Sequence, residues 1–378
     1  MMPTSYETGG PDPGRRPLGP VHGIVLPAML FVAGSMITAC EDGNSGSASE
    51  SPASPTTFRM SAADRDSSLD AIQRWLTAGR ADNAIAVART LAERLPDDPH
   101  VRLALGRTLL ALGSEARIDP GGGPTRARAL SAEAVEALRP AYDAWRDGNP
   151  RAAETRRSLG LALEGDDRLE EAIQIYAEAR LEEDPVSRFH LGLALLRAER
   201  PDEAAIVLSE VESVRPDDAF VVAARAEAAR TLGRPDEART LADAAVRLDG
   251  GSWPIRVQRA SILRRLGDPK AAIESLLAMD DSSRLELPVL EEMTEGWLAL
   301  GRPAAAADQW AELARVRRDD PIASFGAAMR ASILFARAGM DGESNTWLEI
   351  GRDLDPMDVR LASTERELES IRAARIRP

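Results

Sequence analysis

The sequence predicts an all-α solenoid built from stacked helix pairs. One observation is an alanine that returns every 34 residues, and a second is a glycine that keeps the same interval five residues upstream. A fixed period of this length is typical of helix-turn-helix repeats, in which each unit buries its apolar face only by stacking on its neighbours. The recurring residues are Ala204, Ala238, Ala272 and Ala306, with Gly233, Gly267 and Gly301; Gly79 and Gly113 are also 34 residues apart.

Further positions recur in phase with the alanine. Small residues let two helices approach closely, large ones fill the space between units, and prolines stop the second helix. A Leu-Gly pair recurs at Leu105-Gly106, Leu159-Gly160 and Leu191-Gly192. A large residue stands four positions after the alanine in four units: Tyr176 after Ala172, Leu208 after Ala204, Leu276 after Ala272 and Trp310 after Ala306. The closing prolines are Pro96, Pro150, Pro216 and Pro356.

Together these residues resemble the tetratricopeptide repeat family. The resemblance implies a right-handed superhelical solenoid, and we interpret residues 61–356 as about eight repeats. The units are expected to begin near residues 65, 99, 153, 185, 219, 253, 287 and 325. Residues 357–378 are expected to form a last helix, whose apolar Val359, Leu361, Leu368 and Ile371 would cap the final unit.

The pattern departs from the family in three places. Unit two carries an insertion at about residues 114–134, in which three glycines at 121–123 are interpreted as a flexible loop. The third unit is about two residues short. The eighth is expected to begin about four residues late, with Ser344 in place of the alanine.

The N-terminal segment has the order of a bacterial lipoprotein signal. Arg15 and Arg16 precede an apolar run that ends in Ile37-Thr38-Ala39-Cys40. This end resembles the lipobox, which implies cleavage of residues 1–39 and lipidation of Cys40. A buried free thiol and an uncleaved membrane anchor are the alternatives, and Pro27 weighs against the anchor.

Residues 40–60 are expected to form a disordered linker between the lipid and the solenoid. They are rich in Ser, Gly, Pro and Ala, a composition that cannot bury a core. The expected location is therefore the bacterial cell envelope. The periplasmic face of the outer membrane is slightly favoured over the inner membrane, because Glu41 stands where an aspartate would retain some lipoproteins.

The composition excludes several classes of function. The formal net charge of −14 repels nucleic-acid phosphate, so no nucleic-acid partner is expected. Cys40 is the only cysteine, which excludes an intramolecular disulfide. The three histidines are far apart, and no zinc-protease, nucleophile-elbow or phosphate-loop motif occurs. No catalytic residue, metal site or cofactor is therefore predicted, and the chain is not expected to be an enzyme.

The resemblance also places a candidate partner-binding groove. In this family the second, fifth, ninth and twelfth positions of each first helix face inward. On this chain those positions form an apolar, a basic and an acidic part, and Arg265 is added because it adjoins one of them. The apolar part is Val186, Phe189, Leu193, Leu196 and Phe220; the basic part is Arg230, Arg264 and Arg265; the acidic part is Glu291 and Glu295. Exposed apolar side chains there would indicate a partner. Alternatively, the two phenylalanines pack against each other inside a tightly wound superhelix.

The resulting expectation is a membrane-anchored scaffold of the cell envelope. Its partners would be other envelope proteins or peptide segments held in the groove, with the membrane reached through the lipid on Cys40. An envelope enzyme or small-ligand receptor with an unrecognised site is one competing interpretation. A purely structural spacer is another.

Overall fold

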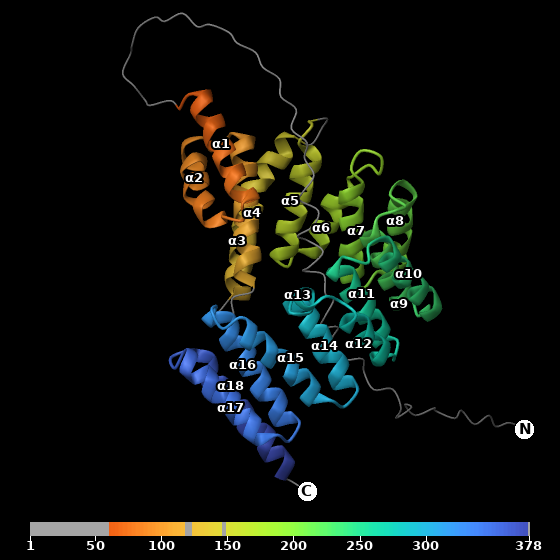
Figure 1. The fold of residues 1–378 in the computed structure, drawn as a ribbon. Coiled ribbons are helices and arrows are strands. Elements are labelled where there is room, and N and C mark those ends of the chain that lie inside the picture. The colour runs from red at the N-terminus through yellow and green to blue at the C-terminus, as the bar shows by residue number, and fades with distance from the viewer. Residues whose placement is uncertain (1–59, 118–122, 146–148, 377–378) are drawn as a thin grey trace, which may run out of the picture. The chain divides into compact units, whose positions relative to one another are not determined.

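The described chain is helical throughout. The computed structural model describes residues 60–117, 123–145 and 149–376, and no strand occurs within those ranges (Figure 1). The predicted signal peptide 1–39, Cys40 and all but the last residue of the predicted linker lie outside the described residues.

Sixteen of the helices form eight consecutive pairs. The first helices are α1 (Ala62–Thr77), α3 (Pro99–Arg117), α5 (Ala152–Gly165), α7 (Pro185–Arg197), α9 (Ala219–Thr231), α11 (Trp253–Arg265), α14 (Leu287–Ala299) and α16 (Pro321–Arg337). The second helices are α2 (Ala81–Arg94), α4 (Gly123–Ala144), α6 (Leu169–Ala177), α8 (Pro201–Val214), α10 (Pro235–Leu248), α12 (Pro269–Leu277), α15 (Pro303–Val316) and α17 (Asp341–Leu354). The short α13 (Asp281–Arg284) and the terminal α18 (Val359–Ile376) complete the described set.

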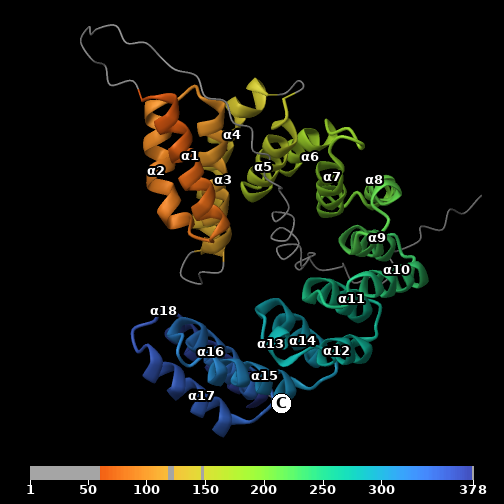
Figure 2. The ribbon, with the colours of Figure 1, turned by 45° about the horizontal axis from the view of Figure 1, so that its top comes forward.

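Each helix packs on its neighbours in the sequence. Figure 2 shows the pairs following one another in chain order, and the first helices of successive units also contact one another from α1 to α14. Contacts between neighbouring units hold the chain together, as expected for a repeat protein. The prediction of an all-α solenoid is confirmed.

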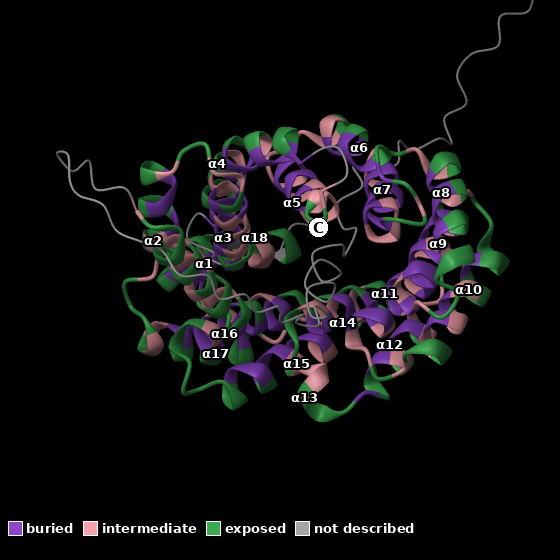
Figure 3. Cartoon of the chain, turned by 90° about the horizontal axis from the view of Figure 1, so that it is seen from above, coloured by how far each residue is buried: buried purple, intermediate pink, exposed green. Residues whose placement is uncertain are grey.

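The periodic alanines lie where the two helices of a unit cross. Ala204, Ala238 and Ala306 are completely buried and Ala272 is 1% exposed. Around Ala238 the crossing is lined by other small residues of α9 and α10, and by Ile262 of the next unit. Buried stretches run along most of the helices in Figure 3. The alanine period therefore marks the close contacts of the solenoid.

The glycine of the Leu-Gly pair allows an equally close approach. A Cβ atom at Gly160 would lie 2.2 Å from the ring of Tyr176, and one at Gly192 would lie 2.5 Å from Leu208. In both units the large residue of the second helix fills the space that the glycine leaves open. This pairing explains why the two positions recur together in the sequence.

The turn between the two helices requires a left-handed backbone. Gly233 supplies it with φ of 71°, but in the third and fourth units the same place is taken by Asp167 (φ 70°) and Glu199 (φ 57°). A residue with a side chain is strained in this conformation. Gly113 does not belong to this set, because α3 continues through it to Arg117.

Replacing Glu199 with glycine should stabilise the protein. The change relieves the left-handed strain and costs some entropy of the unfolded chain, so we expect a net gain of about 0.5–1 kcal/mol in the free energy of unfolding. Urea titration of the two proteins measures it. The reverse change, Gly233→Glu, is the control: a Cβ there meets no atom within 4 Å, so any loss reports the backbone alone. Equal stability of all three proteins would contradict this explanation.

Two of the predicted departures need correction. Residues 114–117 and 123–134 of the insertion are helical, because the extra residues lengthen α3 and α4. Of the three glycines interpreted as a loop, 121 and 122 lie outside the described residues, whereas Gly123 is the first residue of α4. The eighth unit begins on time at Pro321, and α16 is longer by four residues than α14 (17 against 13). Ser344 is fully buried in α17, and its backbone carbonyl accepts a hydrogen bond of 2.7 Å from the hydroxyl of Ser332.

Helix α18 packs on α16 and covers the last unit. Leu361 and Leu368 are buried, and Ile371 packs against the same core. Val359 is 77% exposed at the first residue of the helix and contributes nothing to the cap. The apolar core of the last units therefore ends on three of the four residues expected there.

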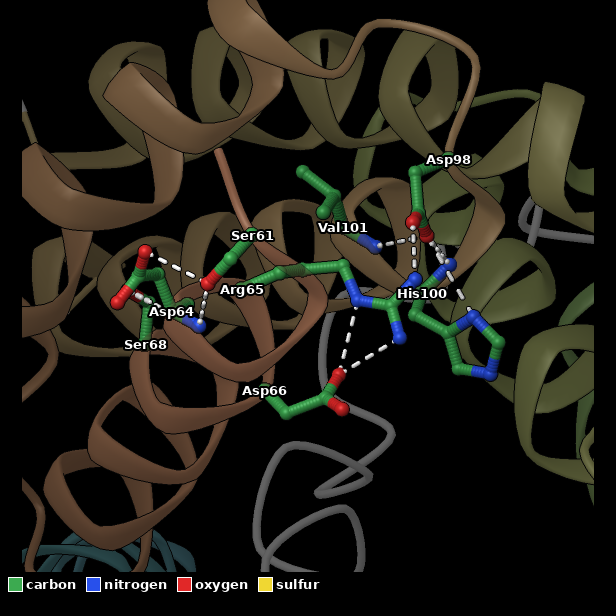
Figure 4. Close-up of polar contacts among 8 residues, drawn as sticks. All are labelled: Ser61, Asp64, Arg65, Asp66, Ser68, Asp98, His100 and Val101. Carbon is green, nitrogen blue, oxygen red and sulfur yellow. Dashed lines mark hydrogen bonds and ion pairs between the residues drawn. The ribbon is translucent and has the colours of Figure 1, made fainter. Parts of the chain in front are cut away.

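At the other end, one aspartate connects the first two units (Figure 4). Asp98 caps α3 by accepting hydrogen bonds from the backbone N–H groups of His100 (2.8 Å) and Val101 (3.3 Å). Its second oxygen lies 3.0 Å from the guanidinium of Arg65 on α1, and Ser61 caps α1 in turn. The backbone hydrogen bonds and the arginine lower the pKa of Asp98, although burial opposes them. The start of α1 is thereby fixed to the start of α3.

Candidate partner-binding face

The structure places the ten predicted site residues on four consecutive first helices, α7, α9, α11 and α14. We call this set the first-helix face. It comprises Val186, Phe189, Leu193, Leu196, Phe220, Arg230, Arg264, Arg265, Glu291 and Glu295.

The apolar part of the first-helix face is largely buried. Phe189 is 9% exposed, and Leu193 and Leu196 are each 6% exposed. Val186 and Phe220 are half-buried. An exposed apolar patch is therefore absent from these described helices, and α7 is packed against α5, α6, α8 and α9.

The basic part of the first-helix face is an ion-pair network that the sequence analysis missed. Arg230 donates two hydrogen bonds (2.9 and 2.8 Å) to Glu227 on the same helix, α9. Arg265 of α11 reaches the same carboxylate at 3.2 Å. Arg264 donates two hydrogen bonds (2.6 and 3.1 Å) to Glu292 of α14. The network therefore connects three consecutive first helices.

Burial sets the electrostatics of this network. The side chains of Glu227 and Glu292 are 6% and 2% exposed, whereas the three arginines remain between 18% and 21% exposed. Hydrogen bonds to the glutamates raise the pKa of Arg230 and Arg264, while burial lowers that of Arg265. Burial also raises the pKa of Glu292, against the attraction of Arg264. The carboxylates thus form the buried layer, and the guanidinium groups lie above them toward solvent.

Only one of the two glutamates, Glu227, carries a signal in the sequence. Glu227 occupies the ninth position of α9, one of the inward-facing positions of the family, and stands three residues before Arg230. Glu292 adjoins the predicted Glu291 and has no signal of its own. Only the packing of α11 against α14 brings it to Arg264.

The acidic part of the first-helix face is exposed. Glu291 and Glu295 lie on the solvent side of α14, and Glu291 is 3.6 Å from Arg330 of α16. Ion pairs also join the earlier first helices: Arg107 of α3 with Glu154 of α5 at 2.6 Å, and Glu164 of α5 with Arg197 of α7. Charged pairs are therefore a general device for fixing successive first helices.

A second buried polar group lies in the third and fourth units. The ring of His190 stacks on that of Tyr176 at 5.5 Å. Burial, with repulsion from Arg157, lowers the pKa of His190 to about 4, so this imidazole is neutral near pH 7. Asp184 is buried between Arg156 and Arg157 at 2.8 and 3.1 Å. Asp184 thus has a cation on either side, while the Nε of Arg156 is buried without a hydrogen-bond partner.

The described residues contain no group of three or more His, Cys, Asp and Glu side chains placed to hold a metal ion. None of the helices that the structure describes has both the length and the apolar character required to span a membrane.

Comparison with known proteins finds similarity to a repeat family. A family model of the tetratricopeptide repeat matches residues 127–188 and 223–284. A tetratricopeptide repeat protein from Parabacteroides merdae ATCC 43184 has a similar structure, with 12% identity, a TM-score of 0.50, and coverage of 66% of this chain and 91% of its own.

Two further solved structures are similar over a smaller part of the chain. One is a thermophilic repeat protein of Thermus thermophilus, with 22% identity, coverage of 53% and 98%, and a TM-score of 0.36. The other is MamA, with 20% identity, coverage of 49% and 92%, and a TM-score of 0.39. A search of curated proteins finds no match to this chain.

Proposed function

We propose that this chain, which belongs to the tetratricopeptide repeat family, holds a segment of a partner protein on the first-helix face. Repeats of this family are in general non-enzymatic scaffolds for protein or peptide partners. The observation that carries the assignment to this face is the ion-pair network of α9, α11 and α14. It orients partly exposed guanidinium groups over buried carboxylates on consecutive first helices.

The network leaves donors for a partner. Arg264 donates to Glu292 from its Nε and one terminal nitrogen, and Arg230 donates to Glu227 from the corresponding atoms. A guanidinium has further N–H groups, and its planar fork matches a carboxylate. Both arginines are about one-fifth exposed, so a partner can reach them. A carboxylate-bearing segment therefore fits this face, with affinity from arginines already held in place.

The test removes one ion pair without leaving a buried charge. In the native host, partners would be crosslinked to the full chain and recovered, with the double variant Arg264→Met and Glu292→Met compared with the parent protein. We expect recovery to fall at least about tenfold, because the lost arginine is a central anchor. The matched control is Lys270→Met with Glu274→Met, an exposed pair at 3.8 Å on α12. Undiminished recovery, with loss only when residues 114–134 are shortened, would move the site to the lengthened helices α3 and α4.

We further propose that the scaffold is tethered to the bacterial envelope by lipid on Cys40, with the outer membrane favoured over the inner one. The support is the order of basic, apolar and lipobox residues before the only cysteine of the chain. A net charge of −14 would keep the protein itself away from anionic headgroups, so attachment would depend on the acyl chains.

The change Cys40→Ser should move the protein from the membrane fraction to the soluble fraction. It should also abolish incorporation of a labelled fatty-acid analogue, because a serine hydroxyl cannot form the thioether. Both are read from fractionation and gel labelling of the native host, with Ser47→Ala in the predicted linker as the control. Persistent labelling of the Cys40→Ser protein would refute lipidation at this residue.

A further inference from the structure

A second surface lies between α8, α9 and the start of α10. The three helices enclose an open groove of about 670 Å³. Its apolar wall includes Ile206 of α8 and Leu232, which follows α9. It shares no residue with the first-helix face, although Arg225 and Ala229 of α9 also line it. The groove is thus a separate feature of the fourth and fifth units.

The wall formed by α8 is unusual for a helix of this protein. Ile206 is 62% exposed although it lies in the middle of α8. Other apolar side chains more than half exposed, such as Ile322 and Val359, lie at helix ends or in connections. Small side chains, Ala205 and Ser209, flank Ile206 and leave its surface accessible. Burying such a side chain would release its apolar surface from water.

The shape of this wall fits another helix. Asp202, Ile206, Ser209 and Ser213 line the groove at helical spacing and extend over about 16 Å of α8. The opposite side of α8, with Ala204, Leu208 and Val211, is buried. A row of small residues around one large side chain is the surface into which a second helix packs its ridges.

Charge determines which helix this would be. Helix α8 contains four carboxylates and no basic residue. Three of the carboxylates are already paired: Glu203 with Arg200, Glu210 with Arg188 and Glu212 with Arg225. The arginines of the groove are already engaged: Arg225 with Glu212, and Arg234 with Glu237 at 3.5 Å. Asp202 is exposed and takes part in none of the ion pairs found among the described residues. Asp202 is therefore the one carboxylate among the groove residues named here that has no arginine beside it, and it complements a cation.

From these observations we propose that the groove between α8 and α10 binds a basic amphipathic helix of a partner protein. An apolar side chain of that helix covers Ile206, and a lysine or arginine of it meets Asp202. This second docking surface goes beyond the first-helix face, which selects a carboxylate, so one copy of the scaffold can hold two segments of opposite charge.

The probe is a helical peptide of leucine and lysine, about 16 residues long, with all leucines on one face. Fluorescence anisotropy measures its binding to the full chain, and a second peptide with glutamate in place of lysine tests the sign of the charge. We expect the lysine peptide to bind at least about tenfold more tightly than the glutamate peptide. Equal affinities would overturn the proposal.

Variants of the chain test the location. The double change Ile206→Ser with Asp202→Asn should weaken the lysine peptide at least about tenfold, because it removes both the apolar contact and the carboxylate. The control Ile322→Ser with Asp308→Asn removes an equally exposed isoleucine and an exposed aspartate on α16 and α15. Equal losses in both double variants would show unspecific attraction to an acidic protein and would overturn the proposal.

A photo-crosslinking residue placed at position 206 provides a measurement that does not depend on removing contacts. It should label the lysine peptide, whereas the same residue at position 322 should not; labelling at 322 alone contradicts the assignment. The Arg264→Met and Glu292→Met protein should bind the lysine peptide as the parent does. If the first-helix face fails its own test while this result holds, only the proposed function falls.

Discussion

Replacing Ala238 with phenylalanine should lower the free energy of unfolding by about 1–3 kcal/mol or more. Ala238 is completely buried among Ala226, Ala229 and Ala242, where α9 and α10 cross. A phenyl ring has no space there, so the two helices must separate. Because each unit is stable only against its neighbours, the damage should extend into the adjacent units. Urea titration followed by circular dichroism measures both the midpoint and the loss of helix.

The control for this prediction comes from the protein itself. Ser344 fills the corresponding place in the eighth unit and is fully buried. Serine therefore fits the space, and Ala238→Ser should cost less than about 1 kcal/mol, since a helical serine can bond the preceding turn. A phenylalanine variant as stable as the serine variant would mean that the alanine period does not mark the close contact.

Replacing Arg264 alone, so that Glu292 loses its partner, should lower the free energy of unfolding by about 2–4 kcal/mol at pH 7. In the variant Arg264→Met, the carboxylate of Glu292 stays 2% exposed without its bidentate partner. The variant Glu292→Met should be milder, because Arg264 is 21% exposed and can turn toward water. The free energy of unfolding of the double variant should be close to that of the parent protein, since two apolar side chains of similar volume replace a desolvated ion pair. A double-mutant cycle in urea gives all three values.

The pH dependence of this loss has a definite sign. Burial already raises the pKa of Glu292 in the folded protein, and removing Arg264 raises it further. A carboxyl group whose folded pKa lies above its unfolded value stabilises the fold at low pH and loses that contribution as the pH rises through the folded pKa. The loss of unfolding free energy caused by Arg264→Met should therefore become smaller as the pH falls from 7 toward 5. A defect that grows on acidification would show that Glu292 is not the group left uncompensated.

The repeat and the residues at its close contacts could be predicted from the amino-acid pattern alone. Ala204, Ala238, Ala272 and Ala306 are all buried at helix crossings, as their period predicts. This succeeds because a repeat imposes the same steric requirement at the same interval, and a small residue is the solution each time. A departure that preserves the helix is harder to interpret. The insertion after Gly113 lengthens α3 and α4, since nothing at Gly113 requires the helix to end.

What the first-helix face presents to solvent depends on how neighbouring helices pack. Position in the helix correctly placed Phe189 and Leu193 on α7, but their exposure depends on how closely α5 and α9 approach, which the repeat period does not specify. Likewise, Glu292 neutralises Arg264 because α14 packs beside α11. Burial and ion pairing are properties of several helices together, whereas the periodic pattern encodes the requirements of one unit at a time.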